Sequence, residues 1–158
     1  MIVLLMGVSG AGKTTIGRLL AERLGAPFIE GDDYHPPANV AKMARGVPLE
    51  DEDRWPWLDR LNELLREHPR AVLACSALKE SYRARLLAGI PDARIVLLHG
   101  DKALIAARVA ARRHRYMPAS LLDSQFAILE PPQDAIVIDV SRDPASCADQ
   151  IARALSRP

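Results

Sequence analysis

Residues 1–15, MIVLLMGVSGAGKTT, decide the fold of this chain. The apolar run from Ile2 to Met6 is typical of a strand buried on both faces of a sheet, and it stops at Gly7. A glycine-rich turn follows. Apolar residues at helical spacing come next, namely Ile16, Leu19, Leu20 and Leu24. We therefore predict a strand, a tight loop and a helix in direct succession.

The loop matches the phosphate-binding pattern G-x-x-x-x-G-K-[ST] in full, within the strand–loop–helix context that the pattern requires. Its glycines let successive backbone N–H groups turn inward around an anion, and the helix start adds its positive end. Lys13 supplies a charge for the β- and γ-phosphates, and the Thr14 hydroxyl is placed to hold Mg²⁺. The residues expected to bind nucleotide are Gly7, Ser9, Gly10, Ala11, Gly12, Lys13, Thr14 and Thr15. A glycine-rich turn without a ligand is the alternative, and it leaves the full match unexplained.

The composition predicts one domain with a small-molecule partner. A chain of 158 residues has the size of a single domain, so residues 1–158 are expected to form one domain. Apolar residues make up 49% and charged residues 26%, as in a soluble globular protein. A net charge of +1 provides no general attraction to nucleic acid or to membranes.

Two further features predict a cytoplasmic protein. The apolar start has no basic region before it and is too short for a secretion signal, and no apolar run is long enough to span a bilayer. Cys75 and Cys147 have neither metal-binding spacing nor the density of a disulfide scaffold, which fits a reducing compartment. Cys75 lies in an apolar run and is expected in the core.

The rest of the chain alternates between strand and helix patterns. Further strands are expected at 27–29, 71–75, 95–98 and 135–138, with helices between them. We predict an α/β fold with a five-stranded parallel sheet, helices on both faces and ligands at the carboxyl ends of the strands. The acidic run at 50–53 is read as a helix start that complements the dipole, with metal binding as the alternative.

Five blocks of sequence, taken together, resemble gluconate kinase. They are GVSGAGKT (7–14), Gly31-Asp32 with His35-Pro36, PLEDEDRWPWL (48–58), CSALKESYR (75–83) and LLDSQFAILEP (121–131). The first block alone indicates only a P-loop protein, but the blocks occur in the family's order and cover most of the chain between 7 and 131. The resemblance implies the nucleoside monophosphate kinase-like fold and Mg²⁺-dependent transfer of the ATP γ-phosphate to the 6-hydroxyl of D-gluconate. It also suggests a homodimer, a mobile lid at roughly 112–126, and Gln125 as a substrate contact.

The lid contains the one departure from the family pattern. Where the family often has Gly-His-Phe, this chain has His114-Arg115-Tyr116, which leaves open which of four side chains contacts phosphate: Arg112, Arg113, His114 or Arg115. The resemblance suggests that one of Arg108 and Arg112 stacks on adenine while the other reaches the phosphates. A nucleic-acid patch is the alternative, and the low net charge and few aromatic residues disfavour it.

A sugar acid has a carboxylate and a row of hydroxyl groups, so its pocket requires a cation, polar groups and a base. We assign Asp32 as the base for the reacting hydroxyl, with a turn-capping carboxylate as the alternative. His35 and Asn39 are polar partners, although His35 could be an exposed loop residue. Arg54 suits a carboxylate because its donors are planar and bidentate, unless it pairs with the acidic run.

Lys79 and Arg83 lie one helical turn apart and are expected to face the same pocket, with a solvated helix surface as the alternative.

Three other functions are weighed against gluconate phosphorylation. Another kinase of this fold could use shikimate or adenylyl sulphate. A nucleotide switch would carry Asn-Lys-x-Asp and Asp-x-x-Gly motifs, and neither occurs in the sequence. A nucleic-acid 5′-kinase would bind oligonucleotides with a steep salt dependence.

Overall fold

Strand β1 (Ile2–Met6) forms the centre of the sheet, as its apolar sequence predicts. The structure is a computed structural model that describes residues 1–111 and 119–157. β1 pairs with β3 (Ala71–Ala74) on one side and with β4 (Ala93–His99) on the other, and all of its residues are buried. The strand needs an unbroken apolar run because helices cover both faces of the sheet around it.

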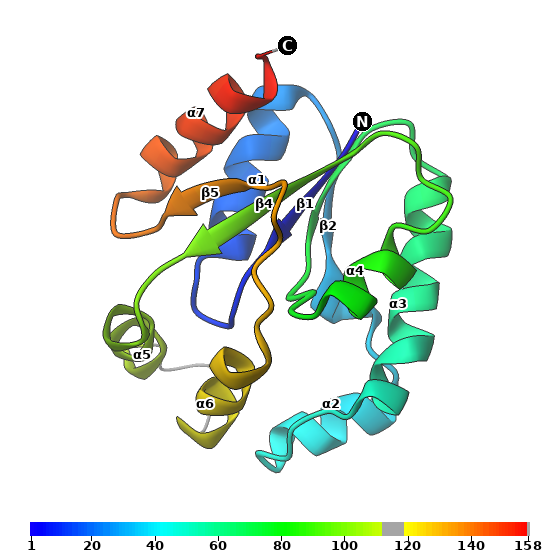
Figure 1. The fold of residues 1–158 in the computed structure, drawn as a ribbon, viewed down its shortest axis with the longest axis vertical. Helices are drawn as coiled ribbons and strands as arrows, with labels where there is room; N and C mark the ends of the chain where they lie inside the picture. The colour runs from blue at the N-terminus through cyan, green and yellow to red at the C-terminus, as the bar shows by residue number, and fades with distance from the viewer. Residues whose placement is uncertain (112–118, 158) are drawn as a thin grey trace.

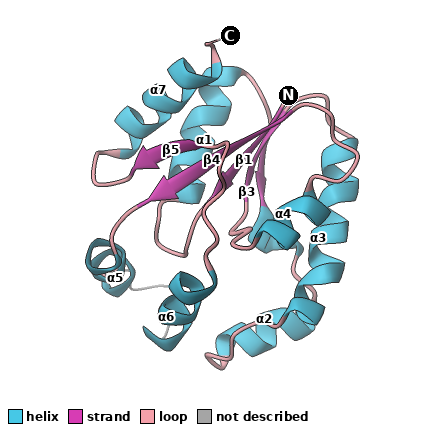
Figure 2. Cartoon of the chain, viewed as in Figure 1, coloured by secondary structure: helices cyan, strands magenta, loops and turns pink. Residues whose placement is uncertain are grey.

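The sheet has five parallel strands in the order β2-β3-β1-β4-β5, with β2 (Phe28–Glu30) and β5 (Ile136–Asp139) at its edges (Figure 2). The predicted parallel sheet is therefore confirmed. The predicted strand bounds differ from the observed ones by one or two residues, and Cys75 lies just beyond β3 but is buried in the core as expected.

Helices connect the strands at most of the positions that the sequence predicts. The exception is a short 3₁₀ helix, η1, directly after β2, where a turn was expected. The helices described are η1 (Gly31–Tyr34), α1 (Lys13–Leu24), α2 (Pro37–Ala44), α3 (Asp51–Arg66), α4 (Glu80–Leu86), α5 (Lys102–Ala110), α6 (Ala119–Ile128) and α7 (Pro144–Leu155). Throughout the described part of the chain, these helices fall short of the length and apolar character that a membrane span needs.

Different helices cover the two faces of the sheet because alternate residues of β1 point to opposite sides. Val3 and Leu5 belong to a buried cluster that includes residues of α1 and α7. Ile2, Leu4 and Met6 pack in a second cluster with residues of α3 and α4. Figure 1 shows α1 and α7 together on one side of the sheet and α3 with α4 on the other.

The acidic run begins α3, as predicted. Glu50 and Asp53 form a capping box, in which each side chain accepts a hydrogen bond from the backbone of the other residue. Asp51, Glu52 and Asp53 occupy the first turn, where negative charge opposes the positive end of the helix dipole.

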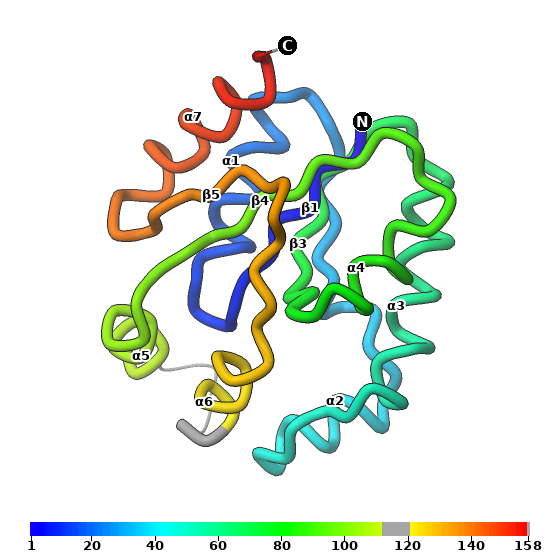
Figure 3. Tube along the Cα trace, in the orientation of Figure 1, coloured from blue at the N-terminus to red at the C-terminus, as the bar shows by residue number. Residues whose placement is uncertain are grey.

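The carboxyl ends of the strands meet at one end of the molecule, where α2, α5 and α6 lie (Figure 3). β1 and β3 are neighbours, but α1 follows β1 on one face and α4 follows β3 on the other. In open α/β sheets such divergence creates the crevice where ligands bind. The N–H of Gly7 donates to the carbonyl of Ser76 over 3.3 Å, so the two loops meet within this crevice.

Candidate active site

The loop between β1 and α1 has the backbone conformation that anion binding requires. Gly10 and Gly12 have φ angles of +86° and +96°, in the left-handed region that L side chains rarely adopt. A Cβ atom at Gly10 would lie 2.6 Å from Cγ2 of Val109, so a larger residue would push α5 away from the loop. Because α1 begins directly after Gly12, the N-terminal end of its dipole faces the loop.

The side chain of Lys13, the first residue of α1, lies over the phosphate loop. Its Nζ atom donates hydrogen bonds to the backbone oxygens of Gly7 and Val8, over 2.9 Å and 3.0 Å. These bonds hold the ammonium group beside the loop amides, where it can meet the phosphate groups of a nucleotide.

Thr14 and Glu30 form the part of the site that fits a metal. The Thr14 hydroxyl donates to Oε2 of Glu30, the last residue of β2. Hydroxyl and carboxylate oxygens are the ligands that Mg²⁺ prefers, so this pair fits the predicted ion. Sequence reasoning singled out Thr14 but missed Glu30. Its place at the carboxyl end of a predicted strand, two residues before Asp32, is the signal that identifies it.

A cleft of about 410 Å³ extends from the loop toward α2 and α6. Trp57 and Glu30, which were not predicted as site residues, line it together with Ser76, which follows the third predicted strand. The predicted site residues in its wall are Ser9, Gly10, Gly12, Lys13, Thr14, Asp32, His35, Arg54 and Gln125. The structure thus brings the proposed base, a cation and the phosphate loop into one cavity.

Asp32 and His35 lie together in the wall of the cleft, with Nε2 of His35 3.7 Å from Oδ1 of Asp32. The His35 ring stacks on Trp57 at a centroid distance of 3.9 Å, and Trp57 Nε1–H donates to the Gly31 carbonyl over 2.8 Å. Only 3% of the His35 side chain is exposed, which excludes the exposed-loop alternative, whereas Asp32 is 53% exposed. Burial lowers the pKa of His35 more than the Asp32 carboxylate raises it, so the ring is neutral at neutral pH.

Arg54, in the first turn of α3, is held in the cleft wall by α4 and by the loop that precedes α3. Its Nη1 atom donates to the Leu49 carbonyl and, over 3.0 Å, to the Tyr82 hydroxyl. That hydroxyl donates in turn to Oδ1 of Asp51 over 2.5 Å, and Lys79 Nζ lies 3.3 Å from the same oxygen. Burial, together with the bond to Asp51, raises the pKa of Tyr82, which keeps the hydroxyl protonated. Arg54 and Lys79 also border an adjoining hollow of about 320 Å³.

Arg83 is not brought to the cleft. It is 5% exposed, and its guanidinium donates to the carbonyls of Ala77, Leu78 and Glu130 over 2.8 Å, 3.1 Å and 2.8 Å. The side chain therefore ties the loop after β3 to the segment after α6. The expectation that Lys79 and Arg83 face one pocket is corrected here, because backbone carbonyls inside the protein take the Arg83 donors.

The Gln125 side chain extends from α6 to the phosphate loop. Its Oε1 atom accepts the Ser9 N–H over 2.7 Å, and its Nε2 atom donates to the Ser9 hydroxyl over 3.1 Å. These two bonds hold α6 against the nucleotide side of the cleft. The predicted role of Gln125 as a substrate contact stays a prediction.

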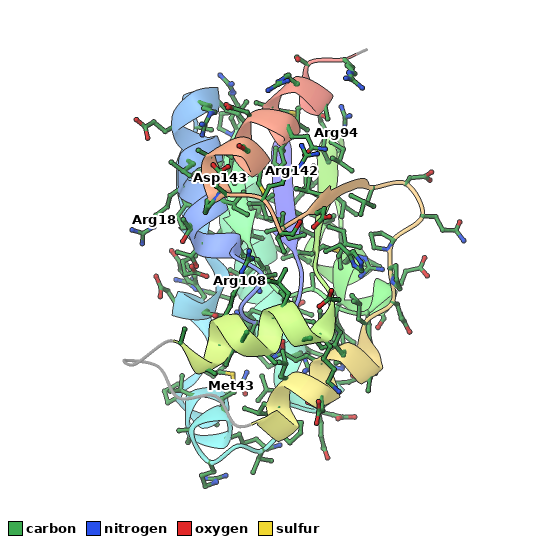
Figure 4. The ribbon with its side chains drawn as sticks, turned by 90° about the vertical axis from the view of Figure 1, so that its left-hand side faces the viewer. Arg18, Met43, Arg94, Arg108, Arg142 and Asp143 are labelled. Carbon is green, nitrogen blue, oxygen red and sulfur yellow. The ribbon has the colours of Figure 1, made fainter. Side chains whose placement is uncertain are left out.

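Other residues predicted to bind nucleotide lie on α1, on α5 and in the predicted lid. Arg108 projects from α5 toward the end of β5, where Nη2 donates to the Val140 carbonyl over 2.5 Å (Figure 4). Thr15 is exposed and lies outside the lining of the cleft. Arg112, Arg113, His114 and Arg115 fall outside the described residues, and the predicted lid (112–126) is described only from 119 onward, within α6.

The parallel sheet, the glycine-rich loop and the adjoining polar cleft define a P-loop phosphotransferase for small molecules. The family model for shikimate kinase matches residues 9–155. Thermosensitive gluconokinase of Escherichia coli is 45% identical over 96% of this chain and 86% of its own length. Gluconokinase of Gluconobacter oxydans is 51% identical, covering 84% of this chain and 76% of its own length.

Solved structures agree with these matches. The crystal structure of a gluconokinase from Sinorhizobium meliloti is 41% identical and superposes with a TM-score of 0.87, covering 97% of this chain and 94% of its own. The chain belongs to the shikimate kinase family of P-loop kinases and, within it, to the gluconokinases.

Proposed function

We propose that this protein transfers the γ-phosphate of ATP to the 6-hydroxyl of D-gluconate, which yields 6-phospho-D-gluconate and ADP. The observation that carries the proposal is that Asp32 and Arg54 line the same cleft as the phosphate loop. A base and a planar cation thus share one cavity with the loop that would hold the phosphate groups. The gluconokinase names of relatives at 45% and 51% identity support gluconate as the acceptor.

The reaction forms a bond between the acceptor oxygen and the γ-phosphorus and breaks the bond between that phosphorus and the β–γ bridging oxygen. The loop amides and Lys13 hold the phosphate groups, while Asp32 receives the proton of the attacking hydroxyl. Arg54 binds the carboxylate at the far end of the sugar acid, because its planar donors match two carboxylate oxygens. Lys79 adds positive charge on the same side.

Thr14 and Glu30 are the residues that would hold Mg²⁺, which neutralises charge on the β- and γ-phosphates when it is bound. Both residues line the cleft. We further infer a cytoplasmic location from the free thiols of Cys75 and Cys147. The homodimer suggested by the resemblance stays a prediction, which light scattering of the purified protein tests.

A coupled ADP-release assay tests the proposal across a panel of acceptors that includes gluconate, other sugar acids, shikimate and adenylyl sulphate. We expect kcat/KM for gluconate to exceed that of each other acceptor by about 10²-fold or more, because a site built for particular polar groups rejects acceptors that lack them. The Lys13→Ala variant controls for contaminating kinases. The proposal fails if gluconate does not stimulate ADP release. Slow hydrolysis that is indifferent to every acceptor would instead favour a nucleotide switch.

A further inference from the structure

Asn39 of α2, which the sequence predicts as a polar partner of the substrate, is instead a buried residue that contacts His35 and Asp53. It is 3% exposed and does not line the cleft as the expected substrate partner. Its Nδ2 atom donates to the Asp53 carbonyl over 2.8 Å and lies 3.2 Å from Nδ1 of His35. A carbonyl can only accept, so the contact with Asp53 fixes which end of the amide carries the hydrogens.

That orientation decides the tautomer of His35. An amide nitrogen donates and does not accept, so Nδ1 of His35 must be the acceptor of the second Asn39 hydrogen. In a neutral imidazole the proton then lies on Nε2. Nε2 is the atom that faces Asp32, at 3.7 Å from Oδ1.

Packing and hydrogen bonds hold the His35 side chain in place, whereas the Asp32 side chain is half-exposed and can rotate. Trp57 stacks on the imidazole at 3.9 Å and is itself anchored to the Gly31 carbonyl. Asp53, whose carbonyl holds Asn39, is itself held in place. Its carboxylate accepts a hydrogen bond from Lys42 Nζ over 2.7 Å and belongs to the capping box of α3. A separation of 3.7 Å is longer than a hydrogen bond, but a small rotation of the half-exposed Asp32 side chain would close it.

We propose that Asn39 is a positioning residue for phosphoryl transfer: it holds neutral His35 as the Nε2–H tautomer, whose N–H aims the Asp32 carboxylate at the reacting hydroxyl. The inference rests on the proposed function in one respect, namely that Asp32 is the base. The contacts run from the Asp53 carbonyl through Asn39 and His35 to Asp32. Arg54 is the other charged group that acts on His35, and it disfavours a charged ring.

The Asn39→Asp variant tests the proposal with almost no change in shape. A carboxylate at this position accepts a hydrogen bond from Nδ1–H and therefore favours the other tautomer. We expect kcat with gluconate to fall about tenfold or more, because a misdirected base loses most of its contribution. The KM for ATP should stay within about twofold, since the phosphate loop is untouched.

Nitrogen-15 NMR of histidine-labelled protein provides a readout besides activity. The chain has four histidines, so the His35 signals are assigned by their loss in the His35→Gln variant. We expect the wild-type spectrum to place the proton on Nε2 and the Asn39→Asp spectrum to place it on Nδ1. A wild-type proton on Nδ1 would overturn the proposal even if the variant did not fold.

Asn62→Asp is the matched control. Asn62 is also buried, and its Nδ2 atom donates to the carbonyls of Leu86 and Ala88 over 2.9 Å and 2.8 Å, away from the cleft. The change removes the amide donor from both carbonyls, while Arg66 Nε, which donates to Asn62 Oδ1 over 3.0 Å, can still pair with the new carboxylate. We therefore expect some loss of stability with normal kcat. An equal fall of kcat in both variants would show a general effect of stability and overturn the proposal. Wild-type protein without gluconate-dependent turnover would reject the proposed function instead, and the NMR result would still stand.

Discussion

At the scale of single residues, two carboxylates at the carboxyl end of β2 have different partners. Glu30 accepts a hydrogen bond from Thr14 at the phosphate loop, whereas Asp32 faces His35 in the wall of the cleft. In the proposed function, Glu30 supports the metal and Asp32 receives the proton of the hydroxyl. The two residues should therefore have separable effects on the kinetics.

We predict that Asp32→Asn lowers kcat by about 10²-fold or more while ATP binding is retained, because an amide cannot receive the hydroxyl proton. Steady-state assays and nucleotide titrations measure the two quantities. Asp33→Asn is the control, since Asp33 is the next residue, is exposed and lies outside the cleft lining. Near-normal turnover of Asp32→Asn would reject its role as the base.

For Glu30→Gln we predict a change in the requirement for Mg²⁺. The concentration that gives half-maximal activity should rise about tenfold or more, as is typical when a group supporting a metal site is lost. The KM for gluconate should stay unchanged. Activity measured across a Mg²⁺ series at fixed ATP checks this expectation, with Glu22→Gln on the exposed surface of α1 as control. Equal Mg²⁺ curves for wild type and Glu30→Gln would contradict it.

At the scale of elements, the Gln125 side chain links α6 to the phosphate loop by hydrogen bonds. Gln125 makes two hydrogen bonds with Ser9, although 116 positions separate the residues along the chain. A neutral hydrogen bond of this kind contributes about 0.5–1.5 kcal/mol. The contact therefore couples the position of α6 to the conformation of the loop that holds the nucleotide.

Replacing Gln125 with Ala should raise the KM for ATP about tenfold, because the loss of two such bonds corresponds to roughly 1–3 kcal/mol. Initial-rate measurements at saturating gluconate test this. Asp123→Ala on the same helix is the control, since Asp123 is exposed and pairs with Lys102. A variant with wild-type KM for ATP would show that α6 does not support the loop.

Helix α7 provides a pH-dependent element. The Asp143 carboxylate caps its start by accepting the N–H of Ser146 over 3.1 Å and its hydroxyl over 2.6 Å. These bonds lower the pKa of Asp143 in the folded protein. The stabilisation is therefore present above the unfolded pKa, about 4, and is lost as pH falls through the lower folded value.

We expect Asp143→Ala to unfold at lower denaturant than wild type at neutral pH, and the difference between the two proteins to shrink as pH falls below about 4. Urea unfolding followed by circular dichroism at several pH values measures this. A difference that stays constant into acid would mean that the carboxylate charge does not stabilise the helix start.

At the scale of the whole molecule, the cleft is built by segments from both halves of the chain. The loop after β1, the 3₁₀ helix η1, α3 and α6 each supply part of its lining. A ligand that contacts all of them binds the folded state alone, because unfolding separates these segments. Ligand binding should therefore stabilise the fold as a unit.

Mg²⁺ and a nonhydrolysable ATP analogue at about 100 times the Kd should stabilise the protein by about 2.7 kcal/mol. For a chain of this length, that corresponds to a rise in Tm of about 5–10 °C. Calorimetric scans of wild type and Lys13→Ala check the prediction, and the variant should show little or no rise. An unchanged Tm for wild type would contradict nucleotide binding.

The sequence predicted the elements well because their signals are local. An unbroken apolar run, a glycine turn and an apolar helical spacing lie within the first 24 residues, and each depends on neighbours only a few positions away. The same holds for the acidic start of α3. Together these local signals predicted the five-stranded parallel sheet and the place of the phosphate site, and the structure confirms the sheet.

The sequence by itself thus determined the strand–loop–helix unit and the edge of the sheet where chemistry can occur. Only the tertiary structure decided which polar side chains enter the cleft: Arg83 is bound to buried carbonyls, Gln125 bonds to Ser9, and Asn39 supports His35. The physical reason is that a long polar side chain can satisfy its donors with any acceptor within reach. Which acceptor that is depends on how segments far apart in the sequence pack together.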